Sequence, residues 1–342
     1  MSNLPPFFRD EEHLEDVMST PTVTLIDELN KLKGDIIILG VGGKMGPTLA
    51  RLAKRAVPHK RVVGIARFSD PTVREKLQSW DIECIAADLL NRAEIESLPK
   101  LDNVIFMAGR KFGSNDREDL TWAMNTLVPA FVGEAFRASR IVAFSTGCVY
   151  PFVNVLHGGA TEATAAKPPP GDYANSCLGR ERMFEYASRK YNTTGRLIRL
   201  NYAIDMRYGV LRDIALKVFN NESIDLTMGH VNVIWQGDAI SMVLRSLGHC
   251  TTPTSALNVS GPETISVKAL AQAFGQRFER QAVFTNSEAN TAWLVNSARA
   301  MQLFDYPTIP LAQMIDWTAD WLLRDQPSLG KPTHYGTRDG KY

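Results

Sequence analysis

The sequence has almost no net charge and few cysteines. Lysine and arginine total 38 and aspartate and glutamate 37, which leaves a formal net charge of +1 over 342 residues. This balance gives no electrostatic reason to expect nucleic acid or an anionic membrane surface as the main partner. The four cysteines are dispersed and form no CxxC pair, which argues against a disulfide framework or a structural zinc site. We therefore expect a cytoplasmic protein without a bound metal.

Long apolar runs and repeats are missing too. No run reaches the roughly 18 apolar residues that a membrane-spanning helix requires. The opening residues 1–18 are acidic and contain proline, unlike a secretory signal. Hydrophobic residues make up 44% and charged residues 22%, which is ordinary globular usage and excludes disorder of the whole chain. The length predicts about two domains, and we expect an enzyme.

What the sequence does contain is an alternation of apolar strands and helical segments. Residues 35–41 read as a strand buried on both faces, residues 44–56 have helical periodicity, and residues 61–66 form the next strand. The pattern continues with expected strands at 81–87, 103–109, 140–146 and 195–200, and with expected helices near 71–79, 91–97, 119–138 and 173–191. Such alternation predicts an α/β fold, a Rossmann-type doubly wound parallel sheet.

A glycine-rich turn joins the first strand to the first helix. Gly40, Gly43 and Gly46 form a GxxGxxG pattern, with Lys44 and Met45 inside it. A turn of this kind lets the backbone approach a pyrophosphate and aims a helix N-terminus at it. Because the pattern lies between a strand and a helix at the start of a βαβ unit, it predicts dinucleotide binding. The alternative is a glycine turn that only packs the helix on the strand.

The second strand ends without the acidic residue that usually accepts the ribose hydroxyls of NAD. That place reads Ala66-Arg67-Phe68-Ser69. Arg67 could pair with a 2′-phosphate, and Lys44 could add a second positive charge. Alternatively, both are solvated surface cations. We therefore favour NADP as the cofactor and keep NAD as the alternative.

Four segments follow from this pattern. We expect an N-terminal extension at 1–34, an NAD(P)-binding Rossmann domain at 35–201, a mainly substrate-binding, smaller α/β region at 202–325 and a polar tail at 326–342. The short amphipathic stretch in the extension is interpreted as a packing element. The tail is rich in glycine and proline and is expected to be a surface wrap or disordered.

Together these motifs resemble the extended short-chain dehydrogenase/reductase family, the NAD(P)-dependent sugar epimerase/dehydratase group, over roughly residues 35–325. Asp88 and Leu89, which follow the third strand, look like the family's contact to adenine. Asn125, within the long helix, matches the family's helix-4 asparagine and is expected at the catalytic site. The resemblance implies the same fold and a nicotinamide cofactor.

The segment FMAGRK after the fourth strand looks like the FAGxK motif of UDP-galactose 4-epimerases. By this likeness Ala108 and Gly109 would border the cofactor. Lys111 would lie near the cofactor phosphates and the substrate.

Two further motifs suggest the catalytic residues. The segment STGCVY resembles the family's S-[ST]-x-x-V-Y-G motif and places Thr146 at the catalytic hydroxyl. Tyr173 heads a helix that resembles the family's Y-x-x-x-K-x-x-x-E run, and we take it as the catalytic tyrosine, which also contacts the cofactor. The lysine position is then Cys177. The literal YxxxK at 186–190 is rejected because it lies near the helix end, 40 residues beyond Thr146.

The loss of this lysine leaves three possibilities open. In the family, the lysine binds the nicotinamide ribose and lowers the tyrosine pKa, and the neutral thiol of Cys177 can do neither. Tyr173 could remain the acid/base, with its phenolate favoured by the oxidised nicotinamide, Lys111 or Arg180. Another residue could carry the proton while Tyr173 orients the substrate. Alternatively, the protein binds its cofactor without turnover.

Substrate contacts are expected from Lys111, Cys148, Asn201 and Arg207 by the same resemblance. Arg207 could hold a phosphate or carboxylate, or it could be an ordinary surface arginine. Gly147 and Cys148 stand where 4,6-dehydratases have an Asp-Glu pair. Elimination is therefore less favoured than oxidation, reduction or epimerisation.

The resemblance thus implies an NAD(P)-dependent oxidoreductase or epimerase. It would act on a sugar or sugar derivative by hydride transfer at a carbinol carbon. The alternative is a catalytically impaired dinucleotide-binding regulatory protein with the same fold. The resemblance also implies a homodimer formed through the helices at 119–138 and 173–191.

Overall fold

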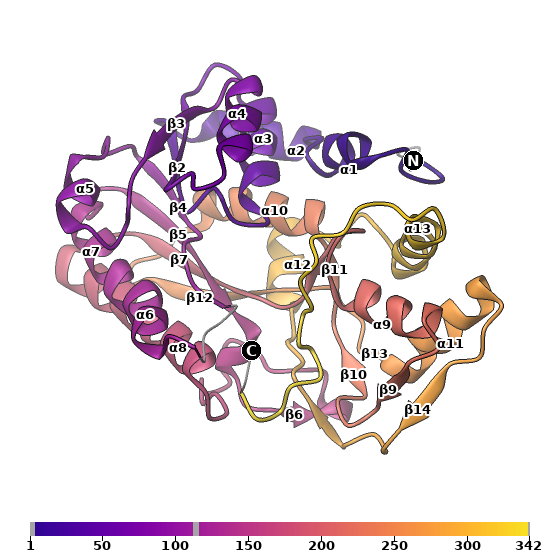
Figure 1. The fold of residues 1–342 in the computed structure, drawn as a ribbon. Coiled ribbons are helices and arrows are strands. Elements are labelled where there is room, and N and C mark those ends of the chain that lie inside the picture. The colour runs from indigo at the N-terminus through magenta and orange to yellow at the C-terminus, as the bar shows by residue number, and fades with distance from the viewer. Residues whose placement is uncertain (1–3, 112–115, 341–342) are drawn as a thin grey trace.

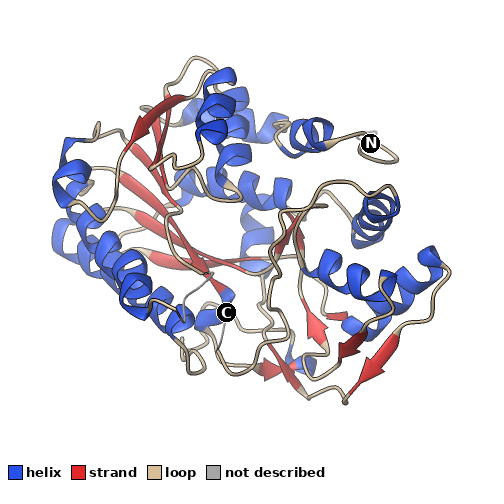
Figure 2. Cartoon of the chain, in the orientation of Figure 1, coloured by secondary structure: helices blue, strands red, loops and turns tan. Residues whose placement is uncertain are grey.

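The computed structural model describes residues 4–111 and 116–340. A larger lobe is built on a central sheet with helices on both faces, and a smaller lobe of helices and short strands lies beside it (Figures 1 and 2). In the described residues, no helix is both long and apolar enough to cross a membrane.

The central sheet has seven parallel strands in the order β12-β7-β5-β4-β1-β2-β3. Its strands are β1 (Ile36–Leu39), β2 (Val62–Ala66), β3 (Glu83–Ala86), β4 (Asn103–Phe106), β5 (Arg140–Thr146), β7 (Gly195–Leu200) and β12 (Ser255–Val259). The chain winds from β1 toward one edge and from β4 toward the other. The carboxyl ends of β1 and β4 therefore form a topological switch point, where ligands bind in sheets of this class.

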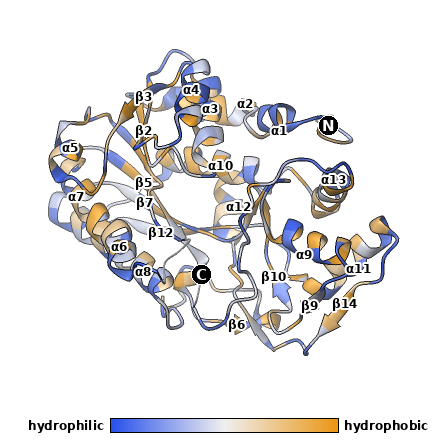
Figure 3. Cartoon of the chain, viewed as in Figure 1, coloured by the Kyte–Doolittle hydropathy of each residue, from blue (hydrophilic) through white to orange (hydrophobic). Residues whose placement is uncertain are grey.

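Side-chain alternation along β1 explains why helices cover both faces. Ile36 and Ile38 contribute to one apolar core and Ile37 and Leu39 to the other, and all four are fully buried. One face packs against α2 (Val23–Lys31), α3 (Gly46–Ala56), α4 (Pro71–Ser79) and α10 (Gln236–Arg245). The other packs against α5 (Arg92–Ser97), α6 (Glu118–Trp122), α7 (Val128–Ala135) and α8 (Asp172–Tyr191). These helices carry both apolar and polar residues (Figure 3).

The helix expected at 119–138 is interrupted. A π-helical turn at Ala123–Leu127 separates α6 from α7, and the buried Asn125 lies inside it. Short π segments often occur at functional positions because they re-aim side chains.

The smaller lobe has its own apolar core. It contains α9 (Val210–Phe219), α11 (Val267–Phe278), α13 (Leu311–Leu323) and the strand pairs β9 (Ser223–Asp225) with β14 (Val283–Thr285) and β10 (His230–Val231) with β13 (Ile265–Ser266). The helix α12 (Ala298–Phe304) packs instead on β12 and α10, in the core of the larger lobe. Two more pairs tie the lobes together: β8 (Ala203–Ile204) with β11 (Ile234–Trp235), and β6 (Val153–Asn154) with β15 (Thr291–Ala292). Single 3₁₀ turns occupy Gly147–Val149, Val155–His157 and Ser246–His249. Because β12 and α10 belong to the larger lobe, the chain beyond residue 201 is shared between both lobes.

The N-terminal extension is part of the core. It forms α1 (Glu11–Met18) and α2, which pack on α3 and α10. Phe8 is 1% exposed; its ring centroid lies 5.9 Å from that of Trp235 and 4.6 Å from that of Trp317. The indole of Trp317 also donates a hydrogen bond to the carbonyl of Pro5 at 2.8 Å. The extension therefore joins the two lobes.

We predict that Phe8→Ala lowers the free energy of unfolding by about 3–5 kcal/mol, the usual loss when a buried aromatic is truncated. Phe7→Ala is the matched control, because Phe7 is 45% exposed and its loss should change stability little. Urea unfolding of both variants measures the difference. Equal stability of the two variants would contradict the integral role of the extension.

Candidate functional site

The glycine turn has the backbone conformation that a nucleotide loop requires. Gly40 has φ +92°, and a Cβ there would lie 2.5 Å from the backbone nitrogen of Ala108. At Gly46 a Cβ would lie 2.0 Å from the carbonyl oxygen of Val41. At Gly43 the nearest atom would be the Gly40 carbonyl oxygen, 3.7 Å away, which is an ordinary van der Waals contact, so a side chain there meets no clash. Gly40 and Gly46 therefore shape the turn, while Gly43 keeps the backbone accessible.

A cavity of about 250 Å³ lies at the carboxyl ends of β1, β2, β3 and β4. Seven of the residues predicted to bind cofactor line it: Gly40, Gly43, Arg67, Asp88, Leu89, Ala108 and Gly109. They come from the loops after four different strands, which only the sheet order brings together. A glycine turn beside a cavity at the switch point fits the adenosine end of a dinucleotide.

Arg67 and Asp70 are two charged residues that follow β2 and line this cavity. Arg67 is exposed and makes no hydrogen bond or ion pair with the described residues. Asp70 also lines the cavity, but its carboxylate accepts hydrogen bonds from the backbone nitrogen and the hydroxyl of Thr72, at 3.0 and 2.7 Å. It thereby caps α4. Of these two residues, Arg67 is therefore the one that could bind an anionic group of a ligand.

Lys44 does not lie where we expected it. Its ammonium donates a hydrogen bond to the carbonyl of Ala203 at 3.2 Å and lies 4.3 Å from the ring centroid of Tyr208. Burial lowers the pKa of Lys44 to about 8. The side chain therefore reaches toward the smaller lobe and not toward a 2′-phosphate. Met45 precedes α3 and packs against the core on that face of the sheet.

The predicted catalytic hydroxyls converge. Thr146 ends β5 and is 8% exposed, and its hydroxyl accepts a hydrogen bond from the backbone nitrogen of Cys148 at 3.2 Å. Tyr173 lies in the first turn of α8, and the side chains of Thr146 and Cys177 lie close enough to influence the pKa of its phenol. Tyr173 and Cys177 are four residues apart, so they share one face of the helix. The sequence spacing and the geometry agree at these three positions.

Burial keeps both Tyr173 and Cys177 neutral. It raises the pKa of the Tyr173 phenol well above its ordinary value and that of the Cys177 thiol to about 11. The guanidinium of Arg180 opposes both shifts, because a nearby positive charge favours the ionised form. Deprotonation of Tyr173 near neutral pH therefore requires positive charge close to the phenol.

Two cations border the phenol. The ammonium of Lys111 lies 5.8 Å from the ring centroid of Tyr173, and burial lowers its pKa. Arg180 is 6% exposed and donates hydrogen bonds to the carbonyl of Phe144 at 2.9 Å and to the side chain of Asn125 at 2.6 Å. Both cations that we considered at the sequence level thus lie beside the candidate catalytic group.

Asn125 acts on the backbone around the site. Its side-chain oxygen accepts a hydrogen bond from the backbone nitrogen of Arg110 at 2.8 Å. Its amide nitrogen donates to the Arg110 carbonyl at 2.9 Å and to the Ser176 hydroxyl at 3.0 Å. Asn125 therefore ties the loop after β4 to α8. It lies at the expected site, where these contacts give it a positioning role.

A buried network of hydrogen bonds and one ion pair supports the site. The sequence motifs revealed only part of this network. Glu181 accepts a hydrogen bond from the hydroxyl of Ser145 at 2.6 Å and forms an ion pair with Arg199 at 2.6 Å. Arg199 also donates to the hydroxyl of Tyr150, which donates to Asn258. The family's motif includes Glu181, but Arg199 lies on a neighbouring strand and no local pattern connects the two. The network fixes β5 against α8.

Two of the residues predicted to contact the substrate, Cys148 and Asn201, have different surroundings. Cys148 is 6% exposed and lies within electrostatic range of Lys111 and Tyr173. The backbone nitrogen of Asn201 donates to the carbonyl of Val259 at 3.0 Å, and the side-chain amide is directed to Trp293. Both residues are therefore close to the end of β5. The contacts of Asn201 also connect the two lobes.

Arg207 is not available to a substrate as we expected. It is 6% exposed, and its guanidinium contacts carboxylate oxygens of Glu11 at 3.1 Å, Glu15 at 2.9 Å and Asp205 at 3.1 Å. These ion pairs bind the N-terminal extension to the smaller lobe. Sequence reasoning missed this role because the partners are about 190 residues apart in the chain.

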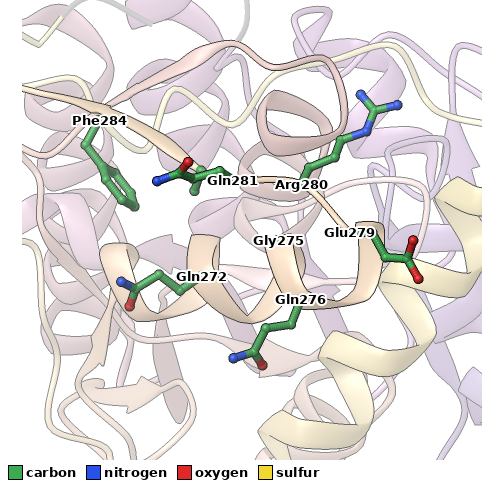
Figure 4. Close-up of a pocket in the computed structure, with 8 residues that line it drawn as sticks. Gln272, Gly275, Gln276, Glu279, Arg280, Gln281 and Phe284 are labelled. Atoms are coloured by element: carbon green, nitrogen blue, oxygen red, sulfur yellow. The ribbon is translucent and has the colours of Figure 1, made fainter.

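A second hollow lies at the end of α11 (Figure 4). Glutamine and charged side chains surround it: Gln272, Gln276, Glu279, Arg280 and Gln281. None of the predicted site residues lines it. Among the described residues, no three histidine, cysteine or acidic side chains gather as metal ligands would.

Residues 36–204 match the model of the NAD dependent epimerase/dehydratase family. This segment belongs to that family. No curated protein sequence matches the chain.

Solved structures share the fold at low sequence identity. UDP-glucuronic acid 4-epimerase from Bacillus cereus, in complex with NAD, is 17% identical with a TM-score of 0.69, and the match covers 85% of this chain and 99% of that one. UDP-glucose 4-epimerase from Thermotoga maritima, with UDP-glucose, is 14% identical with a TM-score of 0.70 over 85% and 99% of the chains. The epimerase Mth375 from Methanothermobacter thermautotrophicus is 16% identical with a TM-score of 0.69 over 89% and 96%. The likeness confirms the Rossmann-type fold.

We predict different outcomes for alanine at two glycines of the turn. Gly40→Ala should destabilise the fold, because its Cβ meets the Ala108 backbone and its φ is positive. Gly43→Ala should fold with unchanged stability but weaken dinucleotide binding about tenfold or more, because its methyl group meets no clash but adds to the lining of the cavity. Thermal unfolding and fluorescence titration with reduced cofactor measure the two effects. Unchanged binding by Gly43→Ala would contradict the assignment of the turn.

Proposed function

We propose that this protein is an NADP-dependent oxidoreductase or epimerase that acts on a sugar or sugar derivative. The observation that carries the proposal is the close approach of Thr146 and Tyr173 at the same edge of the sheet as the dinucleotide cavity. The membership of residues 36–204 in the NAD dependent family supports it. So does the fold shared with solved UDP-sugar epimerases.

In this mechanism the nicotinamide, when bound, supplies the chemistry of hydride exchange with the substrate carbinol carbon. Tyr173 exchanges the proton of the substrate hydroxyl, and Thr146 orients the oxygen by a hydrogen bond. Lys111 and Arg180 supply the positive charge that the phenolate needs, in place of a lysine at Cys177. Thr146 is buried and Tyr173 is partly buried, so contact with water is limited, which strengthens these electrostatic effects.

The absence of carboxylates at Gly147 and Cys148 disfavours dehydration, as the sequence suggested. The solved epimerases named above make a nucleotide-linked sugar the first substrate class to test. The alternative function is a regulatory protein that binds the dinucleotide without turnover, and the neutral Cys177 is what favours it. No disulfide joins the four cysteines, all of which lie in the described residues, and this supports our proposal of a reducing compartment, the cytoplasm.

We predict that Tyr173→Phe lowers kcat by about 10²–10⁴-fold, the usual contribution of a general acid/base. Tyr186→Phe is the matched control, because Tyr186 heads the literal YxxxK on the same helix and is 59% exposed. Steady-state kinetics against a panel of sugars and UDP-sugars, followed at the reduced-cofactor absorbance, measures both. Full activity in Tyr173→Phe would show that another residue carries the proton. Tight cofactor binding without any turnover by the native protein would favour the regulatory alternative.

Arg67 is expected to select NADP. We predict that Arg67→Ala weakens NADP binding about 10–100-fold, as the loss of a charge-assisted hydrogen bond would, and leaves NAD binding unchanged. Arg189→Ala, which removes an exposed arginine elsewhere, should leave both affinities unchanged. Calorimetric titration with each cofactor provides the test. A preference for NAD in both the native protein and Arg67→Ala would refute this assignment.

We also propose a homodimer formed through α6, α7 and α8. Large apolar side chains are exposed there, with Trp122 40%, Leu127 46% and Tyr186 59% accessible. We predict that the native protein sediments as a dimer, that Leu127→Lys shifts it to monomer, and that Leu156→Lys does not. Leu156 is 86% exposed and lies elsewhere. A native monomer in sedimentation velocity would reject the interface.

A further inference from the structure

The end of the chain forms an ordered segment across the site. Residues 328–340, here called the strap, follow α13 and run back between the two lobes, so that the described chain ends beside α8 (Figure 1). The strap contains no helix or strand. Its position therefore depends on specific contacts with both lobes.

A clasp between Thr333 and Asp213 anchors the middle of the strap. Both the backbone nitrogen and the hydroxyl of Thr333 donate to one carboxylate oxygen of Asp213, at 2.8 and 2.5 Å. Thr333 is 2% exposed, and its hydroxyl also accepts from the backbone nitrogen of Tyr335. Hydrogen bonds to a carboxylate are stronger than neutral ones, so this clasp is the main polar attachment of the strap to α9.

Contacts on either side of the clasp hold the strap in place. Tyr335 is 7% exposed in the core of the smaller lobe. Arg338 donates to the carbonyl of Thr291 at 2.9 Å and lies 4.2 Å from the ring centroid of Phe152. A Cβ at Gly340 would lie 1.7 Å from the carbonyl oxygen of Pro170, so the two backbones are in direct contact. The strap thus abuts the loop that leads into α8 and Tyr173.

The strap also contacts a cation of the site. The carbonyl of Thr333 accepts a hydrogen bond from the ammonium of Lys111 at 3.1 Å. The same ammonium lies 5.8 Å from the ring centroid of Tyr173. Asp213 contributes a favourable electrostatic interaction with Lys111 from the other side of the clasp. One residue of the strap therefore connects a cation from the larger lobe to a carboxylate from the smaller lobe.

We propose that the strap is a positioning element of the active site, in which the clasped Thr333 holds the Lys111 ammonium beside Tyr173. The inference rests on the proposed function and explains how the site keeps a cation without a lysine at Cys177. Arg180 needs no such element, because its guanidinium is already bonded to Asn125 and to the Phe144 carbonyl. The side chain of Lys111 is long and flexible, and the bond to the Thr333 carbonyl restricts the position of its ammonium.

The test compares two substitutions at the clasp in the full-length protein. Thr333→Val keeps the shape of the side chain but removes its hydroxyl, and Thr333→Ser keeps the hydroxyl. Ser328→Ala is a control within the strap, because Ser328 is exposed and bonds only to Gly330 nearby. Three measurements apply: amide hydrogen exchange of residues 328–340, the rate of Lys111 acetylation by acetic anhydride, and the pH profile of kcat.

For Thr333→Val we expect faster exchange in the strap, Lys111 acetylated about tenfold faster and kcat about tenfold lower, in line with the loss of a hydrogen bond to a charged group. The rising limb of the pH profile should move to higher pH, because a cation that leaves the phenol raises its pKa. Thr333→Ser and Ser328→Ala should behave as the native protein does.

Unchanged strap exchange in Thr333→Val would overturn the clasp. Faster strap exchange with an unchanged rate of Lys111 acetylation would overturn the positioning of Lys111, and so would an unchanged kcat and pH profile. If the native protein turns over no substrate, the proposed function fails by itself. Exchange and acetylation then decide whether the strap holds Lys111, since neither needs turnover.

Discussion

A phenol buried beside a neutral thiol is the constraint around which this site is organised. Burial raises the pKa of Tyr173 far above its ordinary value, and Cys177 contributes no compensating charge. Positive charge must therefore come from elsewhere in the fold. The structure brings it from two directions, with Arg180 from about two turns further along α8 and Lys111 from the loop after β4. Much of the surrounding polar network serves to hold these two cations in place.

That network makes the two lobes depend on each other. Arg207 from the smaller lobe pairs with Glu11 and Glu15 of the N-terminal extension, and Lys44 in the glycine turn donates to the carbonyl of Ala203. The extension, the glycine turn and the smaller lobe thus share one set of buried ion pairs and hydrogen bonds. Breaking one partner of such a buried set leaves the others with unpaired charge, which costs more than the pair itself stabilises. The cleft geometry is therefore set by the whole chain.

The dinucleotide end of the site is simpler. The glycine turn needs glycines only where a Cβ would clash. The residues that line the cavity come from loops that follow parallel strands. Local sequence encodes both features, because glycine spacing and the strand-to-helix transition are short-range patterns. The same holds for Thr146, at the end of β5, and for Tyr173 and Cys177, one helical turn apart.

The sequence by itself therefore determined the alternating fold and the glycine turn, and it predicted the three neighbouring site residues Thr146, Tyr173 and Cys177. It did not predict that Lys44 bonds to Ala203 or that Arg207 pairs with Glu11 and Glu15, since these partners lie far away in the chain. It could not predict that the tail returns to Lys111, nor that Arg199 meets Glu181. Those contacts join residues from separate elements, and their partners are chosen by packing and by the need to pair buried charge. Only the tertiary structure decides such pairings.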